Sequence, residues 1–167
     1  MTAGRSAGAA AMSVLLLVAG CRQPDRLDME RATRQIRTSL VRTYGRSITK
    51  LDCPSKVEAR RGDSFRCSLQ VDGHPLSIVV TQATDDGDLR VRATAAVLDM
   101  AKVRADLKRT LAKQLGRKGL SAGCGAAKLR IVPPGGSFDC RVRDAKGSKL
   151  VTVKVRDVNG TVTYEIH

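Results

Sequence analysis

The chain after residue 21 contains one pattern written twice. When the sequence is shifted by 71 residues, apolar, glycine and cysteine positions of the two halves coincide. The matched pairs are Ala32 with Val103, Ile36 with Leu107, Leu40 with Leu111, Gly45 with Gly116 and Cys53 with Cys124. After a two-residue insertion, placed at Pro133-Pro134, the pairs are Gly62 with Gly135, Ser64 with Ser137, Phe65 with Phe138 and Cys67 with Cys140. Repeats of this length are whole small domains, because solenoid units run from about 20 to about 50 residues. The sequence therefore predicts two tandem domains, residues 25–95 and 96–167.

Each unit opens with a helix pattern. Apolar residues recur every three or four positions, which places them on one helical face. They are Met29, Ala32, Ile36 and Leu40 in the first unit and Val103, Leu107, Leu111 and Leu115 in the second. Asp99 is the expected N-cap of the second helix, and Gly45 and Gly116 stand where a left-handed helix end favours glycine. We interpret both apolar faces as core faces.

Each unit continues with strand patterns. Between Ser64 and Val71, apolar and polar residues alternate, which buries one face of a strand. Similar runs surround Ile78 and Val91. Short glycine-containing turns separate the runs, and such turns favour antiparallel neighbours. The predicted fold class is α+β, with two tandem repeats that each pack a helix on an antiparallel meander of about four strands.

The first 20 residues have the order of a secretory signal: basic Arg5, an apolar run from Ala7 to Val18, and small residues before Cys21. The run is too short to span a bilayer, which needs about 20 apolar residues. The segment Val18-Ala19-Gly20-Cys21 resembles the lipobox of bacterial lipoproteins. That resemblance implies cleavage before Cys21, acylation of its thiol with diacylglycerol, and a short linker over residues 21–24. The alternative is an ordinary signal peptide that happens to end at a cysteine.

Four cysteines remain after Cys21, and an even set in an exported protein is typical of disulfides. The chain has two Phe, two Tyr and no Trp, so its core buries little aromatic area and covalent links gain importance. Three pairings are open, and Cys53–Cys67 with Cys124–Cys140 is the simplest because each unit can then fold alone. Redox and zinc sites are disfavoured, because the sequence has no C-x-x-C pair.

The formal net charge of +14 points to an anionic partner. Nucleic acid is disfavoured, because the export signal removes the chain from the cytosol and aromatic stacking platforms are missing. We expect anionic lipid, wall polymer or an envelope protein instead. The residues expected to contact an anionic surface are Arg31, Arg34, Lys102, Arg109 and Lys113. The alternative is that the basic residues only keep the fold soluble.

No converging set of catalytic residues is evident. His74 falls in a turn and His167 ends the chain, and no nucleophile elbow, H-E-x-x-H or P-loop occurs. Asp85-Asp86-Gly87-Asp88 lacks the ligand spacing of a known calcium loop, and a turn explains it equally well. None of these polar residues recurs in both units. We therefore expect a non-enzymatic protein without a cofactor or metal.

The assembled residues resemble the DUF4333 domain of actinobacterial lipoproteins. In the first unit the resemblance rests on Cys53-Pro54, Val57, Gly62, Phe65, Cys67, Gly73 and the apolar run to Val80. The second unit departs from this pattern, with Gly125 after Cys124 and a longer loop at Pro133-Pro134. The resemblance implies an exported, often lipid-anchored domain with a cysteine pair, and it implies no particular activity.

Two functional hypotheses follow from these features. The first is a binding module for an anionic envelope component or envelope protein, anchored at the extracytoplasmic face of the cell membrane. The alternative is an inhibitor or regulator of an envelope protease or wall enzyme, acting through Arg61 or the turn from Pro133 to Gly136.

Overall fold

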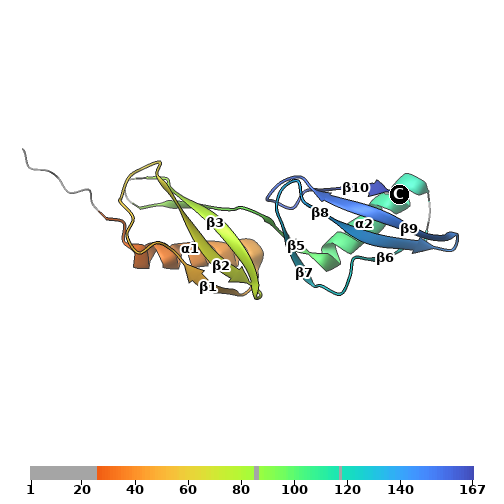
Figure 1. Ribbon diagram of the computed structural model, residues 1–167, viewed down its shortest axis with the longest axis horizontal. Coiled ribbons are helices and arrows are strands. Elements are labelled where there is room, and N and C mark those ends of the chain that lie inside the picture. Colours follow the sequence, from red (N-terminus) through yellow and green to blue (C-terminus); the bar gives the residue numbers. More distant parts are fainter. Residues whose placement is uncertain (1–25, 85–86, 117) are drawn as a thin grey trace, which may run out of the picture.

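The computed structural model describes residues 26–84, 87–116 and 118–167. Within them the fold is α+β, with two helices and antiparallel sheets (Figure 1). We call α1 and β1 to β4 the first lobe: α1 Met29–Tyr44, β1 Ile48–Asp52, β2 Ser64–Val71, β3 His74–Gln82 and β4 Leu89–Ala93. The second lobe comprises α2 Met100–Leu115, β6 Ser121–Gly123, β8 Ser137–Asp144, β9 Gly147–Val155 and β10 Val162–Ile166. Between the lobes, β5 Ala96–Asp99 pairs with β7 Leu129–Val132 to form a two-stranded ribbon.

Both larger sheets have four strands, all antiparallel. The strand order is β1-β2-β3-β4 in the first lobe and β10-β9-β8-β6 in the second. The predicted alternation is confirmed: β2 buries Phe65, Cys67, Leu69 and Val71, while the residues between them face outward or are half-buried. A helix packs on the apolar face of each sheet, so each lobe has its own hydrophobic core.

The helix ends follow from local chemistry. Asp28 and Asp99 cap the first turns of α1 and α2 with their carboxylates, and Gly45 and Gly116 end the helices at φ values of 59° and 63°. Left-handed backbone of this kind favours glycine, because other residues place Cβ against the following carbonyl. The predictions for Asp99, Gly45 and Gly116 are therefore confirmed.

Corresponding elements of the two lobes are evenly offset along the chain. Both ends of α2 lie 71 residues after those of α1 (29 to 100 and 44 to 115). Strands β8, β9 and β10 begin 73 residues after β2, β3 and β4 (64 to 137, 74 to 147 and 89 to 162). The offset therefore grows by two residues between the helices and these strands.

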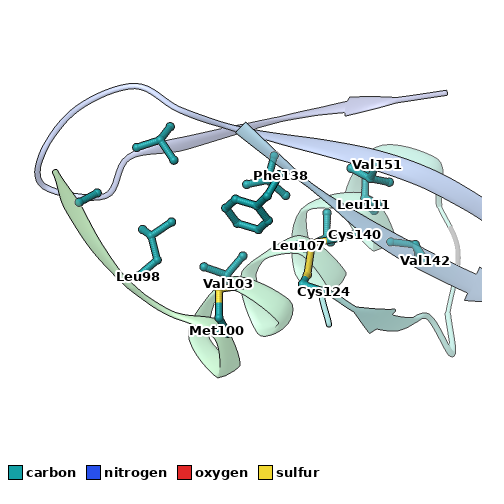
Figure 2. Packing of buried hydrophobic residues seen from close by; sticks show 13 residues of the cluster. Leu98, Met100, Val103, Leu107, Leu111, Cys124, Phe138, Cys140, Val142 and Val151 are labelled. Atoms are coloured by element: carbon teal, nitrogen blue, oxygen red, sulfur yellow. A yellow bond between two sulfur atoms is a disulfide. The ribbon is translucent and has the colours of Figure 1, made fainter. Parts of the chain in front are cut away.

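Disulfides join Cys53 to Cys67 and Cys124 to Cys140, the simplest of the three pairings open to the sequence. Cys53 lies directly after β1 and Cys67 faces inward on the neighbouring strand β2. In the same way, Cys124 lies directly after β6 and Cys140 faces inward on β8. Cys67, Cys124 and Cys140 are buried. In Figure 2 the Cys124–Cys140 bond lies beside Leu107 of α2, within the second core.

The ribbon was not expected from the sequence, and it contributes to both cores. Ala96 and Leu98 of β5 are buried in the second core. Leu129 of β7 is buried in the first core, and Val97 and Ile131 pack against that core. Because strand side chains alternate in direction, one face of the ribbon meets each lobe. In the first lobe, the corresponding segments form only an isolated bridge between Arg26 and Glu58.

Candidate functional site

The five basic residues expected to contact an anionic surface all lie on the two helices and are exposed. Two of them pair within their own helix, Arg34 with Glu30 and Arg109 with Asp106. Arg31, Lys102 and Lys113 form no salt bridge within the described residues, although the charge of Lys102 acts on Asp99. The five residues belong to helices of different lobes, and only Lys102 lines the large cleft described next.

A cleft of about 850 Å³ lies between the lobes. The end of α1 and strand β4 supply one side, and the first turns of α2 with β10 and the loop before it supply the other. The floor includes Val97, Leu98 and Asp99 of the ribbon. The cleft therefore lies where the C-terminal end of α1 and the N-terminal end of α2 meet the junction of the two lobes.

Arg46 links the two lobes at this cleft. Its Nη1 donates to Asp72 Oδ2 at 2.8 Å in the β2–β3 turn, and its Nη2 donates to Asp99 Oδ2 at 2.5 Å. The other oxygen of Asp99 accepts the backbone N–H groups of Ala101 and Lys102 at 2.9 and 3.2 Å. These backbone hydrogen bonds, together with the charge of Arg46, hold the pKa of Asp99 below its usual value.

Asp106 is the second carboxylate at the cleft, and both of its oxygens also accept hydrogen bonds. Oδ1 accepts from Arg109, and Oδ2 accepts the hydroxyl of Tyr164 at 2.7 Å. Burial, with the neighbouring Asp106 carboxylate, raises the pKa of Tyr164, so its hydroxyl stays protonated and acts as a donor. Burial also raises the pKa of Tyr44 on the opposite side.

The remaining polar groups at the cleft are mainly cationic. Arg92 of β4 and Lys102 of α2 are exposed, and their side chains form no hydrogen bond or salt bridge within the described parts of the chain. The charge of Lys102 also helps to lower the pKa of Asp99. Apolar side chains accompany them: Val91, Val97, Val158 and Val162. After internal pairing, the cleft thus offers positive charge beside an apolar and aromatic surface.

The other residues considered from sequence do not join this cleft. His74 begins β3 and is exposed, and His167 lies 3.0 Å from the hydroxyl of Thr152 at the surface. Arg61 and Pro133 to Gly135 lie in exposed turns. Cys21, with the leader and linker, and Asp85 and Asp86 lie outside the described residues.

The described residues contain neither a metal-ligating cluster nor a membrane-spanning helix. No group of His, Cys, Asp or Glu side chains among them has a metal-ligating arrangement. No helix among them is long and apolar enough to cross a bilayer.

Sequence reasoning missed Tyr44, Arg46, Arg92 and Tyr164. They come from four segments, and no motif spacing connects them. Tyr44 and Tyr164 are the only two tyrosines of the chain, but their sequence positions do not indicate that both line one cleft.

Comparison with known proteins gave one match. No curated protein and no solved structure matches the chain significantly. Residues 9–87 match the family model described as "Domain of unknown function (DUF4333)". The match includes most of the first lobe, so the chain carries a DUF4333 domain at residues 9–87.

Proposed function

We propose that this chain is a lipid-anchored protein of the extracytoplasmic membrane face that binds an anionic envelope component without catalysing a reaction. The anchor would be the diacylated Cys21, because two acyl chains retain a protein stably whereas one does not. The two disulfides support an oxidising compartment, since such bonds are rare in the cytosol. The short linker before α1 would keep the first lobe near the headgroups.

The observation that carries this proposal is the excess of basic side chains without acidic partners. The chain has 30 Lys and Arg against 16 Asp and Glu. The carboxylates at the lobe junction, Asp72, Asp99 and Asp106, are already engaged by arginines. Arg31 and Lys113, with Arg92 and Lys102 at the cleft, remain available to an external anion.

We further propose that the chain holds two tandem copies of one domain, residues 25–95 and 96–167, each with one disulfide. The even offsets of helices and strands support this, as do the two equivalent helix N-caps, Asp28 and Asp99. The family match stops at residue 87, and Gly125 and the longer loop at Pro133-Pro134 are two departures of the second copy. In this proposal, the β5–β7 ribbon belongs to the second copy and connects it to the first copy.

Vesicle binding tests the proposed function. The mature chain with Cys21→Ser is mixed with vesicles of phosphatidylglycerol and phosphatidylcholine, or of phosphatidylcholine alone, in low and high salt. We expect sedimentation only with the anionic vesicles and at low salt, because exposed charges are screened at high ionic strength. At about 1 kcal/mol per basic residue, Arg31→Ala with Arg34→Ala should weaken binding by roughly 10- to 30-fold.

The matched control replaces the same two residues by lysine, which keeps the charge and should keep the binding. Equal, salt-independent association with both vesicle types would mean that the basic charge only solubilises the protein. Salt-insensitive capture of one envelope protein, with no vesicle binding, would favour the inhibitor or regulator hypothesis instead.

A further inference from the structure

We propose that the cleft between the lobes binds one anionic amphiphile, a molecule with a phosphate or carboxylate head and an apolar body. This inference rests on the proposed function and narrows it from a charged surface to a single pocket. It concerns the pocket lined by Tyr44, Arg92, Lys102 and Tyr164, of which sequence analysis had singled out only Lys102.

The size and construction of the cleft suit a small molecule. Its volume of about 850 Å³ lies within the usual range of ligand pockets, roughly 300 to 1,000 Å³. Both lobes and the ribbon contribute walls, and pockets occur preferentially at such junctions. The hydrogen bonds of Arg46 to Asp72 and Asp99 join the two sides, so the pocket is preorganised rather than formed on binding.

The charge of the cleft selects an anion. All four carboxylate oxygens of Asp99 and Asp106 already accept hydrogen bonds from the protein, and both acids are paired with arginines, so their negative charge is largely compensated. The guanidinium of Arg92 and the ammonium of Lys102 form no hydrogen bond or salt bridge among described residues. A phosphate or carboxylate in contact with either cation would form charge-assisted hydrogen bonds, which are about twice as strong as neutral ones. The backbone amides of the first turn of α2 are already used by Asp99, so the side chains must supply this recognition.

An apolar part of the cleft surface, beside its polar groups, suits an apolar body. Val91, Val97, Val158 and Val162 line it together with the two tyrosines. Covering these side chains is favourable because it removes apolar surface from water. A free inorganic anion would leave this surface wet, whereas an amphiphile would cover it.

Intrinsic fluorescence can report on this cleft alone. The chain has no tryptophan, and both of its tyrosines line the cleft. The mature Cys21→Ser chain is titrated with dihexanoyl phosphatidic acid below its micelle concentration. Parallel titrations use dihexanoyl phosphatidylcholine and inorganic phosphate. We expect a saturable change in tyrosine emission with phosphatidic acid and much weaker responses to the two other probes.

The variants locate the site. Arg92→Ala and Lys102→Ala should each weaken phosphatidic acid binding by roughly tenfold or more. Arg141→Ala with Lys149→Ala removes two exposed cations from the second sheet, outside the cleft lining, and should change the affinity less than about twofold. Circular dichroism checks that each variant is folded. Tyr44→Phe and Tyr164→Phe assign the emission change to one or both rings.

Each other outcome contradicts a stated part of the inference. Equal affinity for inorganic phosphate would refute the amphiphile, and equal affinity for phosphatidylcholine would refute the anionic head. Unchanged affinity of the Arg92 and Lys102 variants, or an absent response, would refute the cleft as the site. If vesicle binding stays salt-dependent in that case, the proposed function stands without this pocket; if vesicle binding also fails, both are wrong.

Discussion

At the scale of single residues, Arg46 has the most consequential contacts. It donates to Asp72, whose backbone has a positive φ of 47° in the β2–β3 turn, and to Asp99 at the start of α2. Asp72 also accepts the backbone N–H of Ser47 at 3.1 Å. The three side chains of this bridge are only 26 to 35% exposed, in contrast to most ion pairs of the chain. One arginine thus fixes a turn of the first lobe against a helix end of the second.

This bridge predicts a pH dependence of stability. The hydrogen bond from Arg46 lowers the pKa of Asp72, and the amides of α2 with Arg46 lower that of Asp99. A carboxyl with a lowered pKa stabilises the fold above its unfolded pKa of about 3.9, and this contribution is lost as the pH falls through the folded value. Arg46→Ala should therefore lower Tm most above pH 5, and the difference from the wild type should shrink toward pH 2.

Thermal unfolding of both proteins from pH 2 to pH 7 measures this effect. Arg60→Ala is the matched control, because Arg60 pairs with Glu58 and Asp63 and all three side chains are at least half-exposed. Exposed pairs contribute about 0 to 1 kcal/mol, so the control curve should follow the wild type. A pH-independent effect of Arg46→Ala would mean that its role is packing rather than charge.

At the scale of elements, the helices and main strands could be predicted from sequence, because each has a local signal. Ala32, Ile36 and Leu40 repeat with the helical period, and Phe65, Cys67 and Leu69 with the period of a strand. The β5–β7 ribbon could not be predicted in this way. Its strands have only four residues each. Because the ribbon lies between two cores, apolar residues are needed on both of its faces, and the sequence shows no alternation of apolar and polar residues there.

The two helix caps allow a matched comparison. Asp28→Ala removes an N-cap and should lower the free energy of unfolding by about 1 kcal/mol. Asp99→Ala should cost more, because it also removes the partner of Arg46. Asp99→Asn keeps a good capping residue and should lie between Asp99→Ala and the wild type. Urea unfolding measures all three, and equal losses for Asp28→Ala and Asp99→Ala would contradict a stabilising role of the bridge.

The disulfides should account for a large share of stability. Cys53–Cys67 and Cys124–Cys140 close segments with sequence separations of 14 and 16 residues. In the chain-entropy model, a loop of this size is worth about 3 kcal/mol. Replacing either pair by alanine should lower the free energy of unfolding by about that amount, as measured by urea titration. A loss below about 1 kcal/mol would show that the aliphatic cores suffice without the links.

At the scale of the whole molecule, the shared ribbon couples the lobes. In Figure 1 the paired strands β5 and β7 lie between the two lobes. Leu129 of β7 follows α2 in the sequence yet is buried in the first core, while Leu98 of β5 is buried in the second. The same scale explains why the cleft could not be predicted. Tyr44 and Tyr164 stand at opposite ends of the described chain, and only the packing of both lobes on the ribbon brings them to one cavity.

Leu129→Ala tests this coupling. Truncating a buried leucine costs about 2 to 5 kcal/mol. Hydrogen exchange should show faster amide exchange in β2 and β3 of the first lobe as well as in the second lobe, because the ribbon packs on both. Leu115→Ala is the control, since Leu115 is 43% exposed at the end of α2 and should have a small effect confined to the second lobe. Changes confined to the first lobe, whose core holds the Leu129 side chain, would mean that the lobes unfold independently.

The account as a whole depends on where the chain matures, and the intact mass of the protein purified from the membranes of the cells that make it tests this most directly. The predicted mass is that of a chain beginning at Cys21, increased by a diacylglyceryl group. It should also show no alkylation of Cys53, Cys67, Cys124 or Cys140 without prior reduction. A chain that retains residues 1–20, carries no lipid and alkylates at all five cysteines would contradict the account.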